Sequence, residues 1–147
     1  MKIAVACDHA GLQLNNVLIE EMQKAGHEVK DFGTYTEESC DYPDYVIPTA
    51  KAVANGEFDR GVVVCGTGLG VSMTANKVHG IRCAVCHDTF SAKATRQHND
   101  ANMLAMGQRV VGTGVALEVL KAFLETDYEG GRHQRRIDKM MALEKQQ

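Results

Sequence analysis

The sequence predicts an α/β protein in which a sheet of five parallel strands carries helices on both faces and one further helix is appended at the C-terminus. Short runs rich in Val, Ile and Ala alternate along the 147 residues with longer segments whose apolar residues recur at helical spacing. The short runs are apolar at almost every position, which is typical of parallel strands covered on both faces. No linker or repeat interrupts the alternation, so residues 1–147 are expected to form a single domain.

The first half of the chain contains three predicted strands and two predicted helices. Residues 2–7 are an apolar run that ends at a polar turn, and residues 12–24 have helical periodicity followed by a glycine. Residues 28–32 alternate between apolar and polar side chains, as a strand does. A helix over 43–54 opens with proline, which suits a first helical turn, and the run 61–65 is almost entirely Val.

The second half continues the same alternation. A helix is predicted over 70–78, and Gly80 marks its end. A strand is predicted next, over 81–86. A helix over 89–97 and a short strand over 103–106 come next, and the chain closes with helices over 115–124 and 134–145. This order predicts a doubly wound, Rossmann-like sheet.

Composition and charge argue against several classes of protein. The formal net charge is −3, so we expect neither nucleic acid nor a membrane as a partner. No apolar run approaches the roughly 20 residues of a membrane span, and the first residues lack the apolar run of a secretory signal. Five cysteines cannot all pair, and we expect them to be free thiols of a cytoplasmic protein.

Polar residues follow several of the predicted strands. Doubly wound sheets bind ligands beyond the carboxyl ends of their strands. Four segments are predicted to converge at that edge: 7–9, 65–70, 87–88 and 107–109.

The glycine-rich segment after the third strand carries the strongest signal. Gly66, Gly68 and Gly70 stand at alternate positions between a buried strand and a helix, and such a turn directs backbone N–H groups toward an anion. Cys65 precedes the first glycine, and a donor-rich loop favours the thiolate form of a cysteine. The alternative interpretation is a tight packing turn beside a small buried thiol.

Three other functions are excluded because this segment lacks residues that they require. A P-loop requires Gly-Lys-Ser/Thr, whereas Gly70 is followed by Val71 and Ser72. A dinucleotide fingerprint has a different glycine spacing and follows the first strand rather than the third. A cysteine phosphatase needs an arginine soon after its cysteine, and the next arginine here is Arg82.

Two polar clusters add candidate residues. His98 lies in the run 96–102 among carboxamides and carboxylates, which suits an acid/base group, although a solvated loop would look the same. Arg132 and Arg136 are i,i+4 neighbours near the start of the last helix, and two guanidinium groups on one face suit a phosphate dianion as well as plain solvation. Arg109 is a third candidate for that role.

The run Cys83-Ala84-Val85-Cys86-His87 matches the haem-attachment pattern of c-type cytochromes. We reject this interpretation because no export signal is present and because positions three apart on a strand face opposite ways. Zinc and thioredoxin-like functions fail for the same reason. Both cysteines are predicted to be core residues.

In combination, these segments resemble the ribose-5-phosphate isomerase B family, which also includes the galactose-6-phosphate isomerase subunits. The matching stretches cover nearly the whole chain in order: 6–11, 41–43, 65–70, 75–77, 80–82, 96–102, 107–112 and 128–133. The resemblance implies a sugar-phosphate substrate and no metal or organic cofactor. It also implies a homodimer, with a tetramer as the alternative, whose sites are shared between subunits.

The resemblance also assigns roles to individual residues. It makes Cys65 the base that moves a proton between C1 and C2, with Thr67 and the amides of Gly66, Gly68 and Gly70 holding a cis-enediolate. It gives ring opening to His98. The remaining residues contact sugar hydroxyls or phosphate (Asp8, His9, Tyr42 and Asn99) or bind the phosphate (Arg109, Arg132 and Arg136).

One branch of this family uses a glutamate in the helix after the glycine loop, where this chain has Val71, so Cys65 is expected to be the base. The resemblance implies the interconversion of ribose 5-phosphate and ribulose 5-phosphate. Isomerisation of allose or galactose 6-phosphate remains an alternative, because one carbon changes affinity by only about 1–3 kcal/mol. A sugar-phosphate sensor without catalysis is the alternative outside enzymes.

Overall fold

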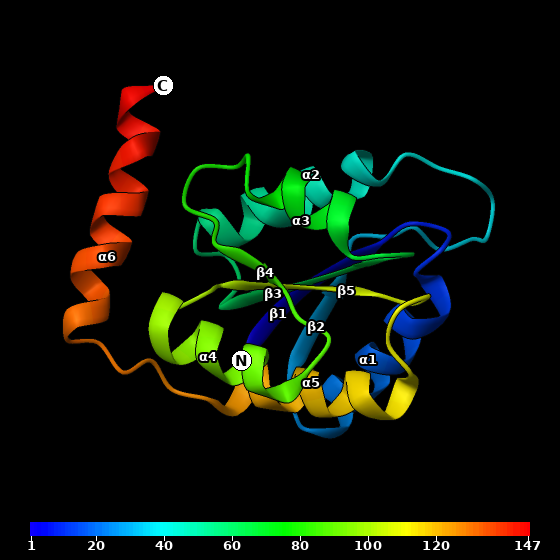
Figure 1. Cartoon of the computed structure of the whole chain (residues 1–147). Coiled ribbons are helices and arrows are strands. Elements are labelled where there is room, and N and C mark those ends of the chain that lie inside the picture. The colour runs from blue at the N-terminus through cyan, green and yellow to red at the C-terminus, as the bar shows by residue number, and fades with distance from the viewer.

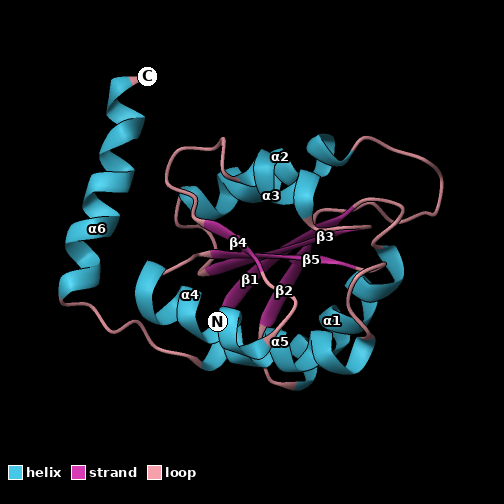
Figure 2. Cartoon of the chain, in the orientation of Figure 1, coloured by secondary structure: helices cyan, strands magenta, loops and turns pink.

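The computed structural model describes residues 1–147 as a three-layer α/β protein (Figure 1). A central sheet lies between two layers of helices (Figure 2). The strands are β1 (Lys2–Cys7), β2 (Glu28–Asp31), β3 (Arg60–Cys65), β4 (Cys83–Val85) and β5 (Met103–Gly107). The helices are α1 (Leu12–Lys24), α2 (Tyr42–Ala54), α3 (Leu69–Ala75), α4 (Thr89–Asn99), α5 (Thr113–Glu125) and α6 (Arg132–Met141), followed by a 3₁₀ turn over Ala142–Gln146.

All five strands are parallel and lie in the order β2-β1-β3-β5-β4, which confirms the predicted doubly wound sheet. The chain runs outward from β1 to β2 and then returns to β3 on the other side of β1. This reversal leaves a crevice beyond the carboxyl ends of β1 and β3, where ligands of such sheets bind. The last strand, β5, lies between β3 and β4, so the turn after β5 is next to the turn after β3.

Each face of the sheet has its own apolar core, because successive strand residues point to opposite faces. Val62 and Val64 belong to the core beneath α1 and α5, whereas Val63 and Cys65 belong to the core beneath α2 and α3. β2 is exposed at alternate residues because it is an edge strand.

Three predicted elements differ most from the structure, and the boundaries of the others agree to within two residues. The third helix ends at Ala75 rather than at residue 78, because the Asn76 side chain bonds both the N–H and the carbonyl of Cys83 and turns the chain toward β4. β4 has three residues rather than six, since the N–H of Arg82 donates to the Asn102 side chain instead of to a neighbouring strand. The last helix begins at Arg132, and its final turns are 3₁₀.

The C-terminal helix α6 stands apart from the rest of the chain, beyond the amino ends of the strands (Figure 1, left). Its buried residues are His133 and Ile137, and it contacts the end of α4. The turn between β5 and α5 lies on the opposite side of the molecule in the same view. No helix in the structure has the length and apolarity needed to span a bilayer.

Candidate active site at the carboxyl edge of the sheet

The crevice between the ends of β1 and β3 contains Asp8 and Cys65. Asp8 follows β1 directly, is 7% exposed, and accepts the N–H groups of Ala10 and Gly11 at 2.9 and 3.1 Å. Cys65 is the last residue of β3 and is 5% exposed. Burial at the end of a central strand holds both side chains in fixed positions.

The loop of residues 65–70, called the Cys65 loop below, presents backbone donors next to the sulfur. The N–H of Gly68 donates to Cys65 Sγ at 3.1 Å, and the N–H of Leu69 donates to Thr67 Oγ1 at 3.3 Å. Gly68 has a φ of +78°, a left-handed conformation that glycine adopts without strain. The N–H groups of Gly66, Thr67 and Gly70 make no hydrogen bond within the chain, so three donors remain for an anionic ligand.

The turn after β5 is packed against this loop. Cys65 pairs with Gly107 in the sheet, the N–H of Gln108 donates to the Cys65 carbonyl at 2.8 Å, and the N–H of Arg109 donates to the Gly66 carbonyl at 3.0 Å. A Cβ at Gly107 would lie 2.5 Å from the backbone carbon of Thr67, so only glycine fits here. The arginine is therefore carried to the Cys65 loop by sheet pairing.

A cavity of about 550 Å³ opens beside Asp8 and is lined by seven residues from the end of β1 and the start of α2. His9 Nδ1 accepts the N–H of Cys40 at 3.2 Å, which leaves Nε2 as the protonated nitrogen of a neutral ring. The ring of Tyr42 lies against Gly70, which connects this cavity to the Cys65 loop. Hydroxyl groups of a bound sugar would therefore meet a carboxylate, an imidazole N–H and a phenol.

Four predicted site residues lie at the other edge of the sheet: His98, Asn99, Arg132 and Arg136. The first two end α4, close to the amino end of β5, and the arginines project from α6 as exposed side chains. β3 runs from this edge to Cys65, and its six residues span roughly 17 Å. Within one chain the structure thus brings together nine of the predicted residues (Asp8, His9, Tyr42, Cys65, Gly66, Thr67, Gly68, Gly70 and Arg109) and places these four elsewhere.

The His98 ring stacks on His133, with ring centroids 4.5 Å apart and an angle of 18° between the planes. Glu129 lies 3.5 Å from the Nε2 atom of His133. The ligand atoms of these three side chains lie within 4.8 Å of one another, close enough to suggest a metal centre. Nearly parallel rings, however, direct their in-plane lone pairs along nearly parallel lines rather than toward one ion, so the stacked geometry does not fit metal ligation.

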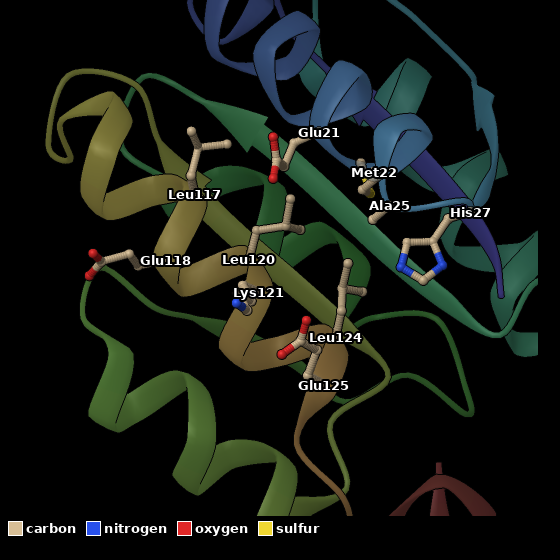
Figure 3. A pocket seen from close by; sticks show the side chains of 10 residues that line it. All are labelled: Glu21, Met22, Ala25, His27, Leu117, Glu118, Leu120, Lys121, Leu124 and Glu125. Atoms are coloured by element: carbon tan, nitrogen blue, oxygen red, sulfur yellow. The ribbon is translucent and has the colours of Figure 1, made fainter.

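A second groove lies between α1 and α5, away from these residues (Figure 3). It has an apolar floor with Leu117, Leu120 and Leu124, and its rim carries three glutamates and one lysine. None of the predicted site residues and no part of the Cys65 loop line this groove. We therefore do not assign the sugar-phosphate site to it.

Three other cysteines, Cys7, Cys83 and Cys86, differ chemically from a catalytic thiol. Burial raises the pKa of Cys7 to about 12 and that of Cys86 to about 11, and it also raises the pKa of Cys83. These groups stay protonated at neutral pH. Cys86 is buried in the core on the α1 and α5 face, and the half-buried Cys83 packs against the core on the other face, which confirms the predicted placement of the two side chains on opposite faces.

A family model described as Ribose/Galactose Isomerase matches residues 3–140. The chain belongs to the ribose/galactose isomerase family. It is 48% identical over 143 residues to ribose-5-phosphate isomerase B of Escherichia coli (strain K12), covering 97% of this chain and 96% of the relative.

Solved structures of family members have the same fold. Ribose-5-phosphate isomerase B of Clostridium thermocellum superposes with a TM-score of 0.98 at 49% identity, covering 99% of both chains. The enzyme of Mycoplasma genitalium with bound ribulose-5-phosphate has a TM-score of 0.94 at 39% identity and covers 99% of this chain and 97% of that chain. This agreement confirms the resemblance found in the sequence.

The sequence predicts no role for two residues that lie beside candidate side chains. Cys40 lines the cavity beside Asp8, and His133 stacks on His98 at the other edge of the sheet. Cys40 reaches the cavity through a long loop and His133 reaches His98 through the packing of α6 on α4, so neither contact has a signal in the spacing of neighbouring residues. His87 and Gln108 lie in segments that the sequence predicts to converge at the carboxyl edge, but no role is predicted for either side chain.

Proposed function

We propose that this chain is an aldose–ketose isomerase that interconverts ribose 5-phosphate and ribulose 5-phosphate in the cytoplasm, without a metal or organic cofactor. The observation that carries the proposal is Cys65 at the end of β3, its sulfur beside a loop with three unused N–H donors. The similarity to ribose-5-phosphate isomerase B of Escherichia coli supports the same substrate, as does the ribulose-5-phosphate bound to the Mycoplasma genitalium enzyme.

Proton transfer needs a base and a way to stabilise the charge that develops on oxygen. The Cys65 thiolate takes the proton from C2 of the open-chain aldose and returns it to C1, while the hydroxyl proton moves from O2 to O1. The enediolate oxygens then lie toward the free N–H groups of Gly66, Thr67 and Gly70 and the Thr67 hydroxyl. Each well-placed donor of this kind contributes roughly 3–4 kcal/mol to a transition state.

The remaining steps require groups that a single chain does not bring to Cys65. Ring opening needs a second acid/base, a role suited to His98, and the phosphate needs cations such as Arg132 and Arg136. We propose that a second copy supplies them: a two-fold axis that places the amino edge of one chain against the carboxyl edge of its partner completes two identical sites. Exposed apolar residues in the Cys65 loop and the helix that follows it support a covered surface there, notably Leu69 (51% exposed) and Met73 (64% exposed).

The activity is tested with purified protein and added chelator against ribose 5-phosphate, allose 6-phosphate and galactose 6-phosphate. We expect the highest kcat/KM for ribose 5-phosphate and no effect of the chelator. Turnover of none of the three sugars would contradict the proposed activity, and loss of activity with chelator would contradict its independence of metals.

The shared site is tested by mixing two inactive variants. Cys65→Ala and His98→Ala affect opposite edges, so a mixed dimer contains one site with both defects and one intact site. Random exchange of subunits should restore about a quarter of wild-type activity, since half the dimers are mixed and half their sites are intact. If the mixture stays as inactive as its parts under conditions where subunits exchange, each site is formed by one chain.

A hexose 6-phosphate isomerase is the second candidate, favoured by one relative. The chain is 37% identical over 139 residues to galactose-6-phosphate isomerase subunit LacB of Clostridium acetobutylicum. The open cavity beside Asp8 has room for one more carbon. The substrate panel above separates the two candidates directly.

A further inference from the structure

His87 lies at the carboxyl edge of the sheet, but none of the steps above uses it. It follows β4, and its Nε2 atom accepts the N–H of Gly107 at 2.8 Å. An accepting Nε2 requires a neutral ring with its proton on Nδ1. Burial lowers the pKa of His87, against a smaller opposite effect of neighbouring Asp88, so the ring is neutral at pH 7.

The group that His87 holds is in direct contact with the Cys65 loop. Gly107 touches the backbone of Thr67 so closely that a Cβ would overlap it. The next two N–H groups of the turn, those of Gln108 and Arg109, donate to the carbonyls of Cys65 and Gly66. Three consecutive N–H groups therefore join the histidine on one side to the Cys65 loop on the other.

A second contact anchors the same turn from the opposite direction. The side-chain amide oxygen of Gln108 accepts the N–H of Leu14 at 2.9 Å, in the first turn of α1. The bond from Leu14 to Gln108 and the bond from Gly107 to His87 together hold the turn after β5 in place. Loss of either bond removes one of the two anchors that hold the turn in place against the Cys65 loop.

We propose that His87 is a positioning residue for the isomerase: through Gly107 it holds the β5–α5 turn, and with it Arg109 and the Cys65 loop, in the arrangement that proton transfer requires. The proposal rests on the isomerase activity proposed above. His87 touches no reacting atom in this role. This role requires only that the side chain at position 87 places a hydrogen-bond acceptor where Nε2 of His87 lies.

The test compares variants with and without an acceptor. His87→Leu and His87→Lys lack one, His87→Gln places an amide oxygen near the same position, and His79→Leu, at an exposed histidine far from the turn, is the matched control. Three quantities are measured on the full chain: kcat and KM with ribose 5-phosphate, the melting temperature, and the hydrogen-exchange rate of the Gly107 amide by NMR.

We expect kcat to fall about tenfold in both variants without an acceptor, with KM changed less than kcat, because small displacements of reacting groups are costly. The Gly107 amide should exchange at least about tenfold faster in them. His87→Gln should recover kcat to within about threefold of wild type and restore slow exchange, and His79→Leu should behave as wild type.

The proposal is overturned if the variants without an acceptor keep wild-type kcat and slow Gly107 exchange, or if His87→Gln is as impaired as His87→Leu. Should the leucine variant fail to fold, the lysine and glutamine pair decides. An unprotected Gly107 amide in the wild-type protein also overturns it. A wild-type protein that isomerises no sugar phosphate would contradict the proposed function instead. The exchange measurements would still test whether His87 holds the Gly107 amide.

Discussion

The two edges of the sheet present functional groups in different ways. At the carboxyl edge, Asp8 and Cys65 are almost fully buried, and much of the chemistry is offered by backbone N–H groups whose positions the strands determine. At the amino edge, Arg132 and Arg136 are exposed side chains on a helix that stands apart from the sheet. The first edge is a preorganised pocket, whereas the second is a surface that needs a partner.

This difference has a physical reason. Stabilising charge on an enediolate demands dipoles that do not reorganise, and a strand-to-helix turn between packed layers provides them. Holding a phosphate dianion demands full positive charge, which is expensive to bury and therefore lies on the surface until a ligand or a subunit covers it. The following substitutions test whether proton transfer depends on the carboxyl edge, and ring opening and phosphate binding on the amino edge.

The largest effect is expected at the carboxyl edge from Cys65→Ala. Removing the base should lower kcat by about 10³-fold and leave sugar-phosphate binding nearly unchanged, because the phosphate contacts lie elsewhere. Steady-state kinetics and calorimetry with ribose 5-phosphate measure the two quantities. Cys83→Ala, at a cysteine packed away from the site, is the matched control, and near-normal kcat in the Cys65 variant would mean that another group is the base.

A smaller effect is expected at the amino edge from His98→Ala. Loss of the ring-opening acid should lower the rate with ribose 5-phosphate about 100-fold. The rate with 4-deoxyribose 5-phosphate, which lacks the hydroxyl needed to close the ring, should change much less. Equal losses with both sugars would show that the histidine acts in another step.

Gly107→Ala tests whether the backbone fit of the carboxyl edge matters. The added Cβ would lie 2.5 Å from the Thr67 backbone, so the turn must shift away from the Cys65 loop. We expect kcat to fall roughly 30-fold and the free energy of unfolding to fall by about 1–3 kcal/mol. Gly114→Ala, where an added Cβ meets nothing within 4 Å, is the control, and similar behaviour of both variants would remove the turn from the mechanism.

The smallest effect is expected from Arg136→Ala. Arg132 and Arg109 remain to bind the phosphate, so KM should rise only about tenfold with little change in kcat, as for the loss of one charge-assisted hydrogen bond. Steady-state kinetics with ribose 5-phosphate at low and moderate salt measure this. A fall in kcat at unchanged KM would place the phosphate elsewhere.

Local patterns in the sequence were enough to predict how strands and helices alternate along the chain, and to predict the glycine loop after the third strand. These features depend on period-two and helical spacing and on glycine at turns, all of which are properties of neighbouring residues. The placement of Cys83 and Cys86 on opposite faces followed from the same periodicity. The end of α3 was missed because the Asn76 side chain bonds the backbone of Cys83, and the start of β4 was missed because the N–H of Arg82 donates to the Asn102 side chain. Both bonds join residues that are not neighbours in the chain.

The sequence by itself thus determined the type of sheet, the residues at the ends of its strands and the family. Only the tertiary structure decided that β5 lies beside β3, which carries Arg109 to Cys65 and brings Gly107 within reach of His87. It also decided that His98, Arg132 and Arg136 lie at the opposite edge from the cysteine. Strand order and helix docking depend on contacts between residues far apart in the chain, and a single sequence carries no local signal for these contacts.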